Sequence, residues 1–437
     1  MARQLACAAA ALSLLAVLSC AEGTLLDGEW DFALSAPAQT GKIMVPGSWE
    51  AQGYGNETVQ MKHQVLTGDN ARGKKGAVGV YSKSVVIEPC DEGGAAVFMV
   101  DRGIHRHALF KIAGKLVGEH TGYLTPFEVE LSPSMVEDCC CGSSCKIEIT
   151  LDGDRPCDAG GCSDALMGTA DDDTDGTGLG GWAGLNGHVS VTCRPKVHIE
   201  QGIANVVPPH ITHPEVTTAS AGSPLAISVD FAISGGWANA AAHIFDNSTG
   251  TLVAVATTSA PQTGNVSLVA NVPAVKLWSP EDRALYTVVV SIDGVGDNAT
   301  TRFGVRSIKT EGYKLLLNGQ RVFLAGYGDD AIYPDTVSPP REKAVYAARL
   351  KFAHEHGFNW VRHHSHVLPP EYFEAADEWG IMVSPELPCD CNTEPPYFAN
   401  ANATGQELYL ASWASYVASL RNHPSIFDWS LCNEMYM

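Results

Sequence analysis

Short runs in which hydrophobic and polar residues alternate occupy the first two thirds of the chain, and Gly, Pro and Asp separate them. Such runs predict strands, because successive side chains of a strand point to opposite faces of a sheet. From 24 to 197 the runs lie at 29–34, 78–87, 96–100, 108–117, 127–131 and 146–151. Strands at this spacing, without a helical period, are typical of a jelly-roll β-sandwich.

A second all-β block follows from 198 to 303. Its alternating runs lie at 225–233, 241–245, 252–256, 266–272 and 285–292. The number and spacing of these runs predict a second sandwich of about the size of an immunoglobulin-like domain.

The period of the pattern changes after Gly304. Strands are predicted at 322–326, 359–362, 381–383 and 426–431, and apolar residues at helical spacing predict helices at 341–356, 370–379 and 406–420. Strands that alternate with helices form either a (β/α)8 TIM barrel or one wing of a doubly wound sheet. A complete barrel takes about 250 residues, more than 304–437 contains. We therefore expect an incomplete TIM barrel with its first four strands.

Residues 1–23 have the pattern of a secretory signal peptide. Arg3 precedes an apolar run, and small residues around Ser19 provide a cleavage site. That run is too short to span a bilayer comfortably, and no later run of about 20 apolar residues occurs. We expect a protein that is secreted or lies in the lumen of the secretory pathway. Lipid attachment at Cys20, as in a bacterial lipoprotein, is the alternative.

Composition narrows the possible partners. The 49 acidic residues outnumber the 28 basic ones and give a formal net charge of −21. Because such a surface repels phosphate backbones and anionic lipids, we expect neither nucleic acid nor a membrane as a partner.

Seven of the 13 cysteines lie between Cys139 and Cys193. In a secreted chain this crowding predicts disulfides that pin a Cys- and Asp-rich insert at 137–180. A zinc site is the less favoured alternative, because no C-x2-C pair is matched by a second one.

The same insert contains the first half of a calcium-binding pattern. Asp171, Asp173 and Asp175 have the spacing of calcium ligands, but Trp182 stands where the bidentate Glu is needed. A solvated acidic loop is the favoured interpretation and calcium binding the alternative, and no other cofactor is expected.

The last predicted strand is followed closely by Asn433 and Glu434. An Asn-Glu pair at the carboxyl end of a barrel strand lies at the rim where barrel enzymes keep their chemistry. Hydrolysis of a glycosidic bond needs two carboxyl groups on opposite sides of the anomeric carbon. We therefore interpret this end of the chain as one half of a glycosidase active site.

Phrases in all three blocks resemble family 2 of the glycoside hydrolases, the group of β-galactosidases, β-glucuronidases and β-mannosidases. They are Leu26 to Trp30, Val45 to Trp49, Gly122 to Phe127, Leu277 to Glu281, Phe303 to Arg306, Asn359 to Arg362, Ala375 to Gly380, Arg421 to Ser425 and Trp429-Ser430 before Asn433-Glu434. Each phrase alone is weak, and it is their order along the chain that carries the resemblance.

The resemblance implies a retaining mechanism, in which one Glu is acid and then base and a second Glu is the nucleophile. Glu434 matches the acid/base, whose pKa must be raised for it to stay protonated near neutral pH. Asn433 matches the residue that hydrogen-bonds the sugar 2-hydroxyl, and Arg362 matches a side chain that orients the nucleophile. The nucleophile itself is expected beyond Met437, so we nominate none in this chain.

Further polar residues lie at the predicted ends of the barrel strands. His363, His364 and His366 follow strand two, where the family carries a single His, and we expect one or two of them to contact substrate. Asp330 and Glu386 follow strands one and three, and each is either a sugar contact or part of a structural salt bridge or helix cap. A metal site built from the three histidines is the less favoured alternative, so no metal is expected.

The favoured hypothesis is a secreted retaining exo-glycosidase that acts on a glycan or oligosaccharide, with this sequence as its N-terminal portion. The alternative is a non-catalytic carbohydrate-binding protein with a degenerate barrel. A third hypothesis is that another chain supplies the second half of the barrel. The sequence leaves the sugar, the linkage and the oligomeric state open, including a homo-oligomer.

Overall fold

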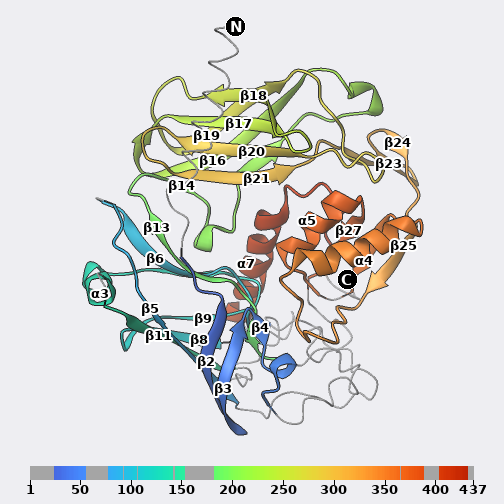
Figure 1. Cartoon of the computed structure of the whole chain (residues 1–437). Coiled ribbons are helices and arrows are strands. Elements are labelled where there is room, and N and C mark those ends of the chain that lie inside the picture. The colour runs from blue at the N-terminus through green and yellow to red at the C-terminus, as the bar shows by residue number, and fades with distance from the viewer. Residues whose placement is uncertain are drawn as a thin grey trace.

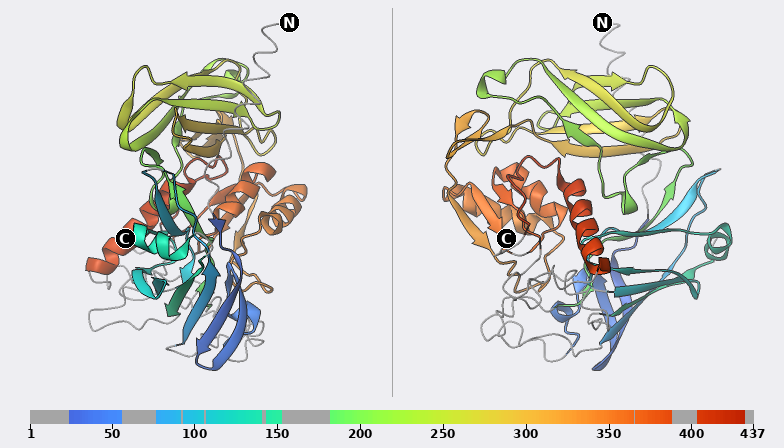
Figure 2. Two further views of the ribbon diagram at one scale, coloured as in Figure 1. Left: turned by 60° about the vertical axis from the view of Figure 1, so that its left-hand side comes forward. Right: turned by 180° about the vertical axis from the view of Figure 1, so that it is seen from behind.

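The computed structural model describes residues 24–55, 77–91, 93–105, 107–140, 143–152, 182–364, 366–387 and 403–431. A first region of β-sheet, from the N-terminal part of the chain, and a second, from its middle, flank the helices of the last part (Figure 1). Seen from behind, helix α7 (Ala403–Leu420) lies between the first sheet region and the other helices (Figure 2).

The first sheet region contains two antiparallel sheets that share one core. The larger has the order β3 (Ala38–Val45), β2 (Gly28–Ser35), β5 (Val78–Val85), β11 (Cys145–Asp152), β8 (His107–Ile112) and β9 (Lys115–Thr121). The smaller has the order β1 (Thr24–Leu25), β13 (Val189–Arg194), β6 (Ala95–Val100) and β10 (Phe127–Glu130). Trp30, Phe98 and Phe110 belong to the hydrophobic cluster between them. Beside these sheets lie β4 (Gly47–Ser48), β12 (Gly184–Leu185), β7 (Ile104–His105), α3 (Pro133–Cys139) and the 3-10 turn η1 (Glu50–Gln52).

The single run expected at 108–117 is two strands. Ala113 and Gly114 both have left-handed backbone angles, with φ of 49° and 75°, and they form the turn between β8 and β9. Successive left-handed residues match the twist of a two-residue hairpin, so the chain reverses within what the hydrophobic pattern presents as one strand.

The second sheet region also has two antiparallel sheets. One has the order β18 (Thr251–Thr257), β17 (Ala240–Asp246), β20 (Tyr286–Ile292) and β21 (Asn298–Phe303). In the other, β16 (Leu225–Ala238) pairs with β14 (His198–Glu200), β15 (His210–Thr212) and β19 (Gln262–Val272). Short 3-10 turns lie at η5 (Ile203–Asn205) and η6 (Thr218–Ser220). All five strands predicted here are present, and Val229 and Val288 from the two sheets share one core.

The last part begins with a ribbon of β22 (Ile308–Glu311), β23 (Lys314–Leu317) and β24 (Gln320–Arg321). A parallel sheet of β25 (Gly326–Asp329), β26 (Trp360–His363) and β27 (Met382–Ser384) follows, with helices α4 (Lys343–Glu355) and α5 (Pro370–Trp379) in its connections. The expected fourth strand pairs through two isolated parallel bridges, from Ile426 to Val383 and from Ser430 to Glu386.

The strand expected at 322–326 is displaced along the chain. Val322 and Leu324 pack instead against a cluster that contains Trp278 and Leu285 of the second sheet region. The apolar residues that suggested a barrel strand therefore bury the connection to the preceding region, and β25 starts only at Gly326.

Two disulfides lie within the described residues, Cys90–Cys193 and Cys139–Cys145. The second of them falls in the segment where cysteine crowding predicted disulfides, while Cys157 and Cys162 lie outside the described residues. Among the helices of the described residues, none combines the length and the apolar character needed to cross a bilayer.

Gly380 directly follows α5 and packs closely against Pro280 of the second sheet region. It has φ of 69°, and its N–H donates to the carbonyl of Ala376, an arrangement that favours glycine after a helix. A Cβ at this position would overlap the carbonyl oxygen of Pro280. The close approach of two backbones therefore requires glycine here for two independent reasons.

Gly380→Ala is expected to lower the free energy of unfolding by about 2–5 kcal/mol, because left-handed strain of about 1–2 kcal/mol adds to overpacking of about 1–3 kcal/mol. Gly312→Ala is the matched control, since Gly312 has φ of 61° and a Cβ at this position would meet only open space. It should show the strain alone. Urea unfolding followed by circular dichroism measures both, and equal losses would contradict the close contact at Pro280.

Candidate functional site

The parallel sheet sorts its residues onto two faces, because consecutive side chains of a strand point in opposite directions. In register, β26 and β27 place Arg362 beside Ser384 and Val361 beside Val383. The two valines lie in the hydrophobic cluster that includes residues of α4 and α5, so theirs is the helix-covered face. Arg362 and Ser384 therefore occupy the other face, which a closed barrel turns to its interior.

Glu386 lies just past the carboxyl end of β27, and its side chain is 1% exposed. Arg362 donates from one terminal nitrogen to Oε1 at 2.9 Å and to Oε2 at 2.8 Å. The hydroxyl of Ser430 donates to Oε2 at 2.6 Å, and the N–H of Ser430 donates to the carbonyl of Pro385 at 3.0 Å. The buried Glu386 thus forms an ion pair with the partly exposed Arg362, which is one of its two sequence-based interpretations. A sugar contact by Glu386 stays a prediction.

The phrase 421–425, which contributes to the family resemblance, anchors the segment before Ser430. The buried carboxylate of Asp377 accepts from the N–H of Ser425 at 3.0 Å and lies 2.7 Å from Nδ1 of His423. The amide of Asn422 donates to the carbonyl of Pro209 in the second sheet region at 2.7 Å. These bonds fix the direction in which the chain approaches the carboxyl ends of the parallel strands.

The three histidines after β26 fall into two environments. The ring of His363 is fully buried on the helix-covered face, with its centroid 4.6 Å from that of Tyr372. His366 is also fully buried and stacks on His363 at 5.0 Å. His364 is partly exposed, and its Nδ1 lies 3.0 Å from the carboxylate of Asp330. Among these residues, His364 and Asp330 are the ones open to solvent, and substrate contact by any of them stays a prediction.

Asp329 was not singled out from the sequence, where Asp330 was preferred. Its carboxylate and the ring nitrogens of His363 and His366 offer donor atoms that all lie within 4.8 Å of one another. The register accounts for this proximity, because Asp329 ends β25 directly beside His363 at the end of β26, whereas the strand expected at 322–326 stopped short of Asp329.

Several sequence-based candidates lie outside the described residues. They are the acid/base candidate Glu434, its neighbour Asn433, the calcium candidates Asp171, Asp173 and Asp175, and the lipid-attachment candidate Cys20. The roles assigned to them stay predictions.

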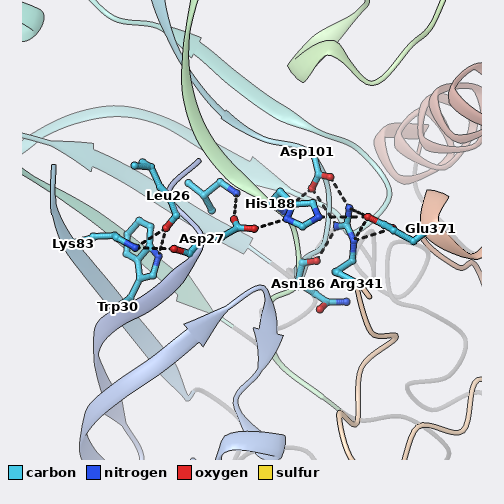
Figure 3. Close-up of polar contacts among 10 residues, drawn as sticks. Leu26, Asp27, Trp30, Lys83, Asp101, Asn186, His188, Arg341 and Glu371 are labelled. Atoms are coloured by element: carbon cyan, nitrogen blue, oxygen red, sulfur yellow. Dashed lines mark hydrogen bonds and ion pairs between the residues drawn. The ribbon is translucent and has the colours of Figure 1, made fainter. Parts of the chain in front are cut away.

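A second cluster of charged residues joins the first sheet region to the helices (Figure 3). Arg341, whose side chain is 6% exposed, donates to Asp101 at 2.7 Å and to Glu371 at 3.1 Å. The ring of His188 lies between Asp27, at 2.5 Å, and Glu371, at 3.4 Å. We call these five residues the charged joint.

The charged joint shifts the pKa values of His188 and Glu371. Burial disfavours the charged form of His188, but hydrogen bonds to Asp27 and Glu371 outweigh it and raise its pKa to about 9. Burial likewise opposes charge on Glu371, yet His188 and Arg341 lower its pKa to about 2. The five groups form one chain of contacts in which acidic and basic side chains alternate, in the order Asp27, His188, Glu371, Arg341 and Asp101.

Shifted pKa values often mark catalytic sites, but the charged joint has the features of an interface. Each of its charged groups has a partner of opposite charge, and its members come from two separate regions of the fold. Its partners lie as many as 240 positions apart in the sequence, as Asp101 and Arg341 do. No local motif announces such a joint, which is why sequence reasoning missed it.

Two family models match the chain. "Glycosyl hydrolases family 2" matches residues 210–306, and "Glycosyl hydrolases family 2, TIM barrel domain" matches residues 308–437. Together they account for just over half of the sequence, and their order follows the order of the last two regions of the fold.

Relatives and solved structures agree with these models. A provisionally named β-glucuronidase from Formosa agariphila is 34% identical over 166 residues, which are 37% of this chain and 16% of that protein. A β-galactosidase from Lactococcus lactis is 29% identical over 167 residues, 36% of this chain and 16% of that protein. The structure of a Bifidobacterium dentium β-glucuronidase complexed with coumarin-3-O-glucuronide aligns with a TM-score of 0.73 and 21% identity, over 95% of this chain and 68% of that one. The matches thus span a minor part of the curated relatives, and the structural likeness shows the fold.

The charged joint makes stability depend on pH at both ends of the range. Because the pKa of His188 is raised, its contribution is complete below about pH 6.5 and is lost as the pH rises through about 9. Because the pKa of Glu371 is lowered, its contribution is complete above about pH 4.5 and is lost as the pH falls through about 2.

We expect His188→Gln to remove most of the fall in melting temperature between pH 6.5 and 9.5 and to weaken the acid limb without abolishing it, because Arg341 still holds Glu371. Thermal unfolding of both proteins across this range measures the effect. A variant whose alkaline limb matches that of the wild type would contradict the assignment of this limb to His188.

Proposed function

The chain belongs to family 2 of the glycosyl hydrolases, and from that premise we propose that it carries the acid/base half of a retaining O-glycoside hydrolase active site. Glu434 is the proposed acid/base, Asn433 the proposed contact to the sugar 2-hydroxyl, and Arg362 a positioning residue at the same rim. The names of the relatives, β-glucuronidase and β-galactosidase, support a β-linked glycan or oligosaccharide as the substrate class.

One observation carries the proposal: the contact of Arg362, Glu386 and Ser430 on the interior face of the sheet. Ser430 is bonded to Glu386 at 2.6 Å, and Glu434 follows it by four residues. Because each residue extends a chain by at most about 3.6 Å, four residues span at most about 14 Å. This sequence separation supports Glu434 as a side chain that acts at the rim occupied by Arg362.

In the proposed reaction, Glu434 first gives its proton to the glycosidic oxygen and later takes one from the attacking water. The nucleophile is a second carboxylate about 5 Å from the first, supplied by a part of the barrel outside this chain. We do not propose Glu386, whose carboxylate accepts from Arg362 and Ser430, for that role. We assign Glu386 to holding Arg362 in place.

We also propose that the protein is secreted. The signal-like pattern of residues 1–23 supports this. The disulfides Cys90–Cys193 and Cys139–Cys145 support it as well, because disulfides persist in oxidising compartments.

Residues 24–437 expressed alone are expected to show no turnover of a panel of nitrophenyl glycosides, because retention of configuration needs two carboxyl groups. Release of nitrophenol measures turnover directly. Hydrolysis that disappears in Glu434→Gln would overturn the view that this chain holds only half of the site. If transcript sequence reads a stop codon immediately after Met437, a non-catalytic carbohydrate-binding protein becomes the better account.

In a protein that carries the complete barrel, Glu434→Ala should slow hydrolysis of glycosides with poor leaving groups by about 10²–10⁴-fold. It should affect dinitrophenyl glycosides far less, because an activated leaving group needs little help from an acid. Turnover of both substrate types by each variant is the measurement.

Glu386→Gln is the matched control for that experiment. Since Glu386 acts through Arg362 and transfers no proton, its loss should reduce turnover of both substrate types by the same factor. Equal losses on both substrates in Glu434→Ala would remove Glu434 from the acid/base role.

A further inference from the structure

The stacked rings of His363 and His366 are an unusual feature of the helix-covered face. Both rings are fully buried. Within the described ranges, three of their four ring nitrogens have no hydrogen-bond partner. They are Nδ1 and Nε2 of His363 and Nε2 of His366. A buried polar atom without a partner costs about 1–3 kcal/mol, and three such atoms in one place call for an explanation such as a bound ion.

A backbone contact fixes the tautomer of His366. Its Nδ1 lies 2.9 Å from the carbonyl oxygen of His364, and since a carbonyl only accepts, the proton must be on Nδ1. In the neutral ring, Nε2 then presents a lone pair. An imidazole that donates one N–H to a carbonyl while its other nitrogen stays free is the arrangement found in protein metal ligands.

The other two proposed ligands lie close to the His366 ring. The carboxylate of Asp329 and the rings of His363 and His366 have donor atoms within 4.8 Å of one another. Asp329 is itself held in place, because one of its oxygens accepts from the N–H of Ala331 at 2.9 Å.

We propose that Asp329, His363 and His366 bind one divalent first-row transition-metal ion, with Zn²⁺ as its reference. Two imidazoles and one carboxylate are a ligand set that zinc and its neighbours use in proteins. Ligand atoms about 2.1 Å from a tetrahedral ion lie about 3.4 Å apart. The side chains therefore need to close by no more than about 1.4 Å, shared between them.

A cavity of about 640 Å³ reaches the Asp329 end of this ligand set, and His363 and His366 do not line it. Asp329 lines the cavity together with Asp330, Tyr327 and Tyr372, and the ring of Tyr372 packs on His363. The carboxylate ligand thus lies between the cavity and the two imidazoles.

The proposed ion would be structural. It lies on the face opposite Arg362, because His363 follows Arg362 directly on β26 and points the other way. Bound there, it would link the end of β25 to the end of β26 and to the loop that carries His366. The proposal rests on these contacts alone and stands or falls independently of the proposed glycosidase function.

The test loads the full chain with Zn²⁺, removes loosely held ion by dialysis, and counts bound zinc by mass spectrometry. The wild type should retain about one more zinc per chain than His366→Ala, whose affinity should be at least 10-fold weaker. His364→Ala is the matched control, because it removes a neighbouring imidazole but keeps the carbonyl that orients His366, and it should bind zinc as the wild type does. Equal zinc in all three proteins, or none in the wild type, would overturn the proposal.

A second measurement needs no variant and remains valid should His366→Ala fail to fold. X-ray absorption of the zinc-loaded wild type is expected to show two imidazole ligands and one or more oxygen ligands at about 2.0–2.2 Å. A coordination shell with oxygen ligands alone, as surface carboxylates would give, would also overturn the proposal.

Discussion

The hydrogen bonding of β26 between β25 and β27 is the constraint on which both candidate sites depend. Parallel pairing fixes the register so that Arg362 lies beside Ser384 and His363 lies beside Asp329. Because side chains alternate along a strand, two residues adjacent in sequence serve opposite faces of the sheet. Arg362 reaches the carboxylate of Glu386 on the interior face, whereas His363 enters the layer under the helices. A shift of one residue would exchange these environments.

A sheet of three paired strands obtains much of its support from the rest of the molecule. The indole N–H of Trp278, in the second sheet region, donates to the carbonyl of Asp377 in α5 at 3.0 Å. From the first sheet region, Tyr123 and Trp182 pack in the same hydrophobic cluster as Tyr416 of α7. Together with the charged joint, these contacts hold the helices from two sides, so the position of the rim depends on both sheet regions.

Much of the fold could be predicted from the sequence because alternation and burial coincide in the two sheet regions. The runs at 225–233 and 285–292, for example, are strands whose alternate residues fill one core. The pattern failed where a turn requires backbone angles that hydrophobicity does not encode, as at Ala113 and Gly114. It also failed at Val322 and Leu324, because an apolar run does not reveal which partner will bury it.

The candidate site was less accessible to sequence reasoning for a related reason. Motif order identified Arg362 and the rim of the sheet, and these are properties of local sequence. The environment of His363 depends on which face of β26 the helices cover, and the pairing of Glu386 with Ser430 depends on where strand four meets strand three. The charged joint depends on contacts between regions distant in sequence, so it became visible only in three dimensions.

Azide trapping is the most direct measurement of the central claim, that Glu434 is the acid/base of a retaining glycosidase. In a protein that carries the complete barrel, azide should partly restore turnover to Glu434→Ala, because a small anion fits the space vacated by the carboxyl group and attacks the glycosyl-enzyme. The account predicts a glycosyl azide of retained configuration. An azide product of inverted configuration, or an active variant that forms no azide product, would contradict it.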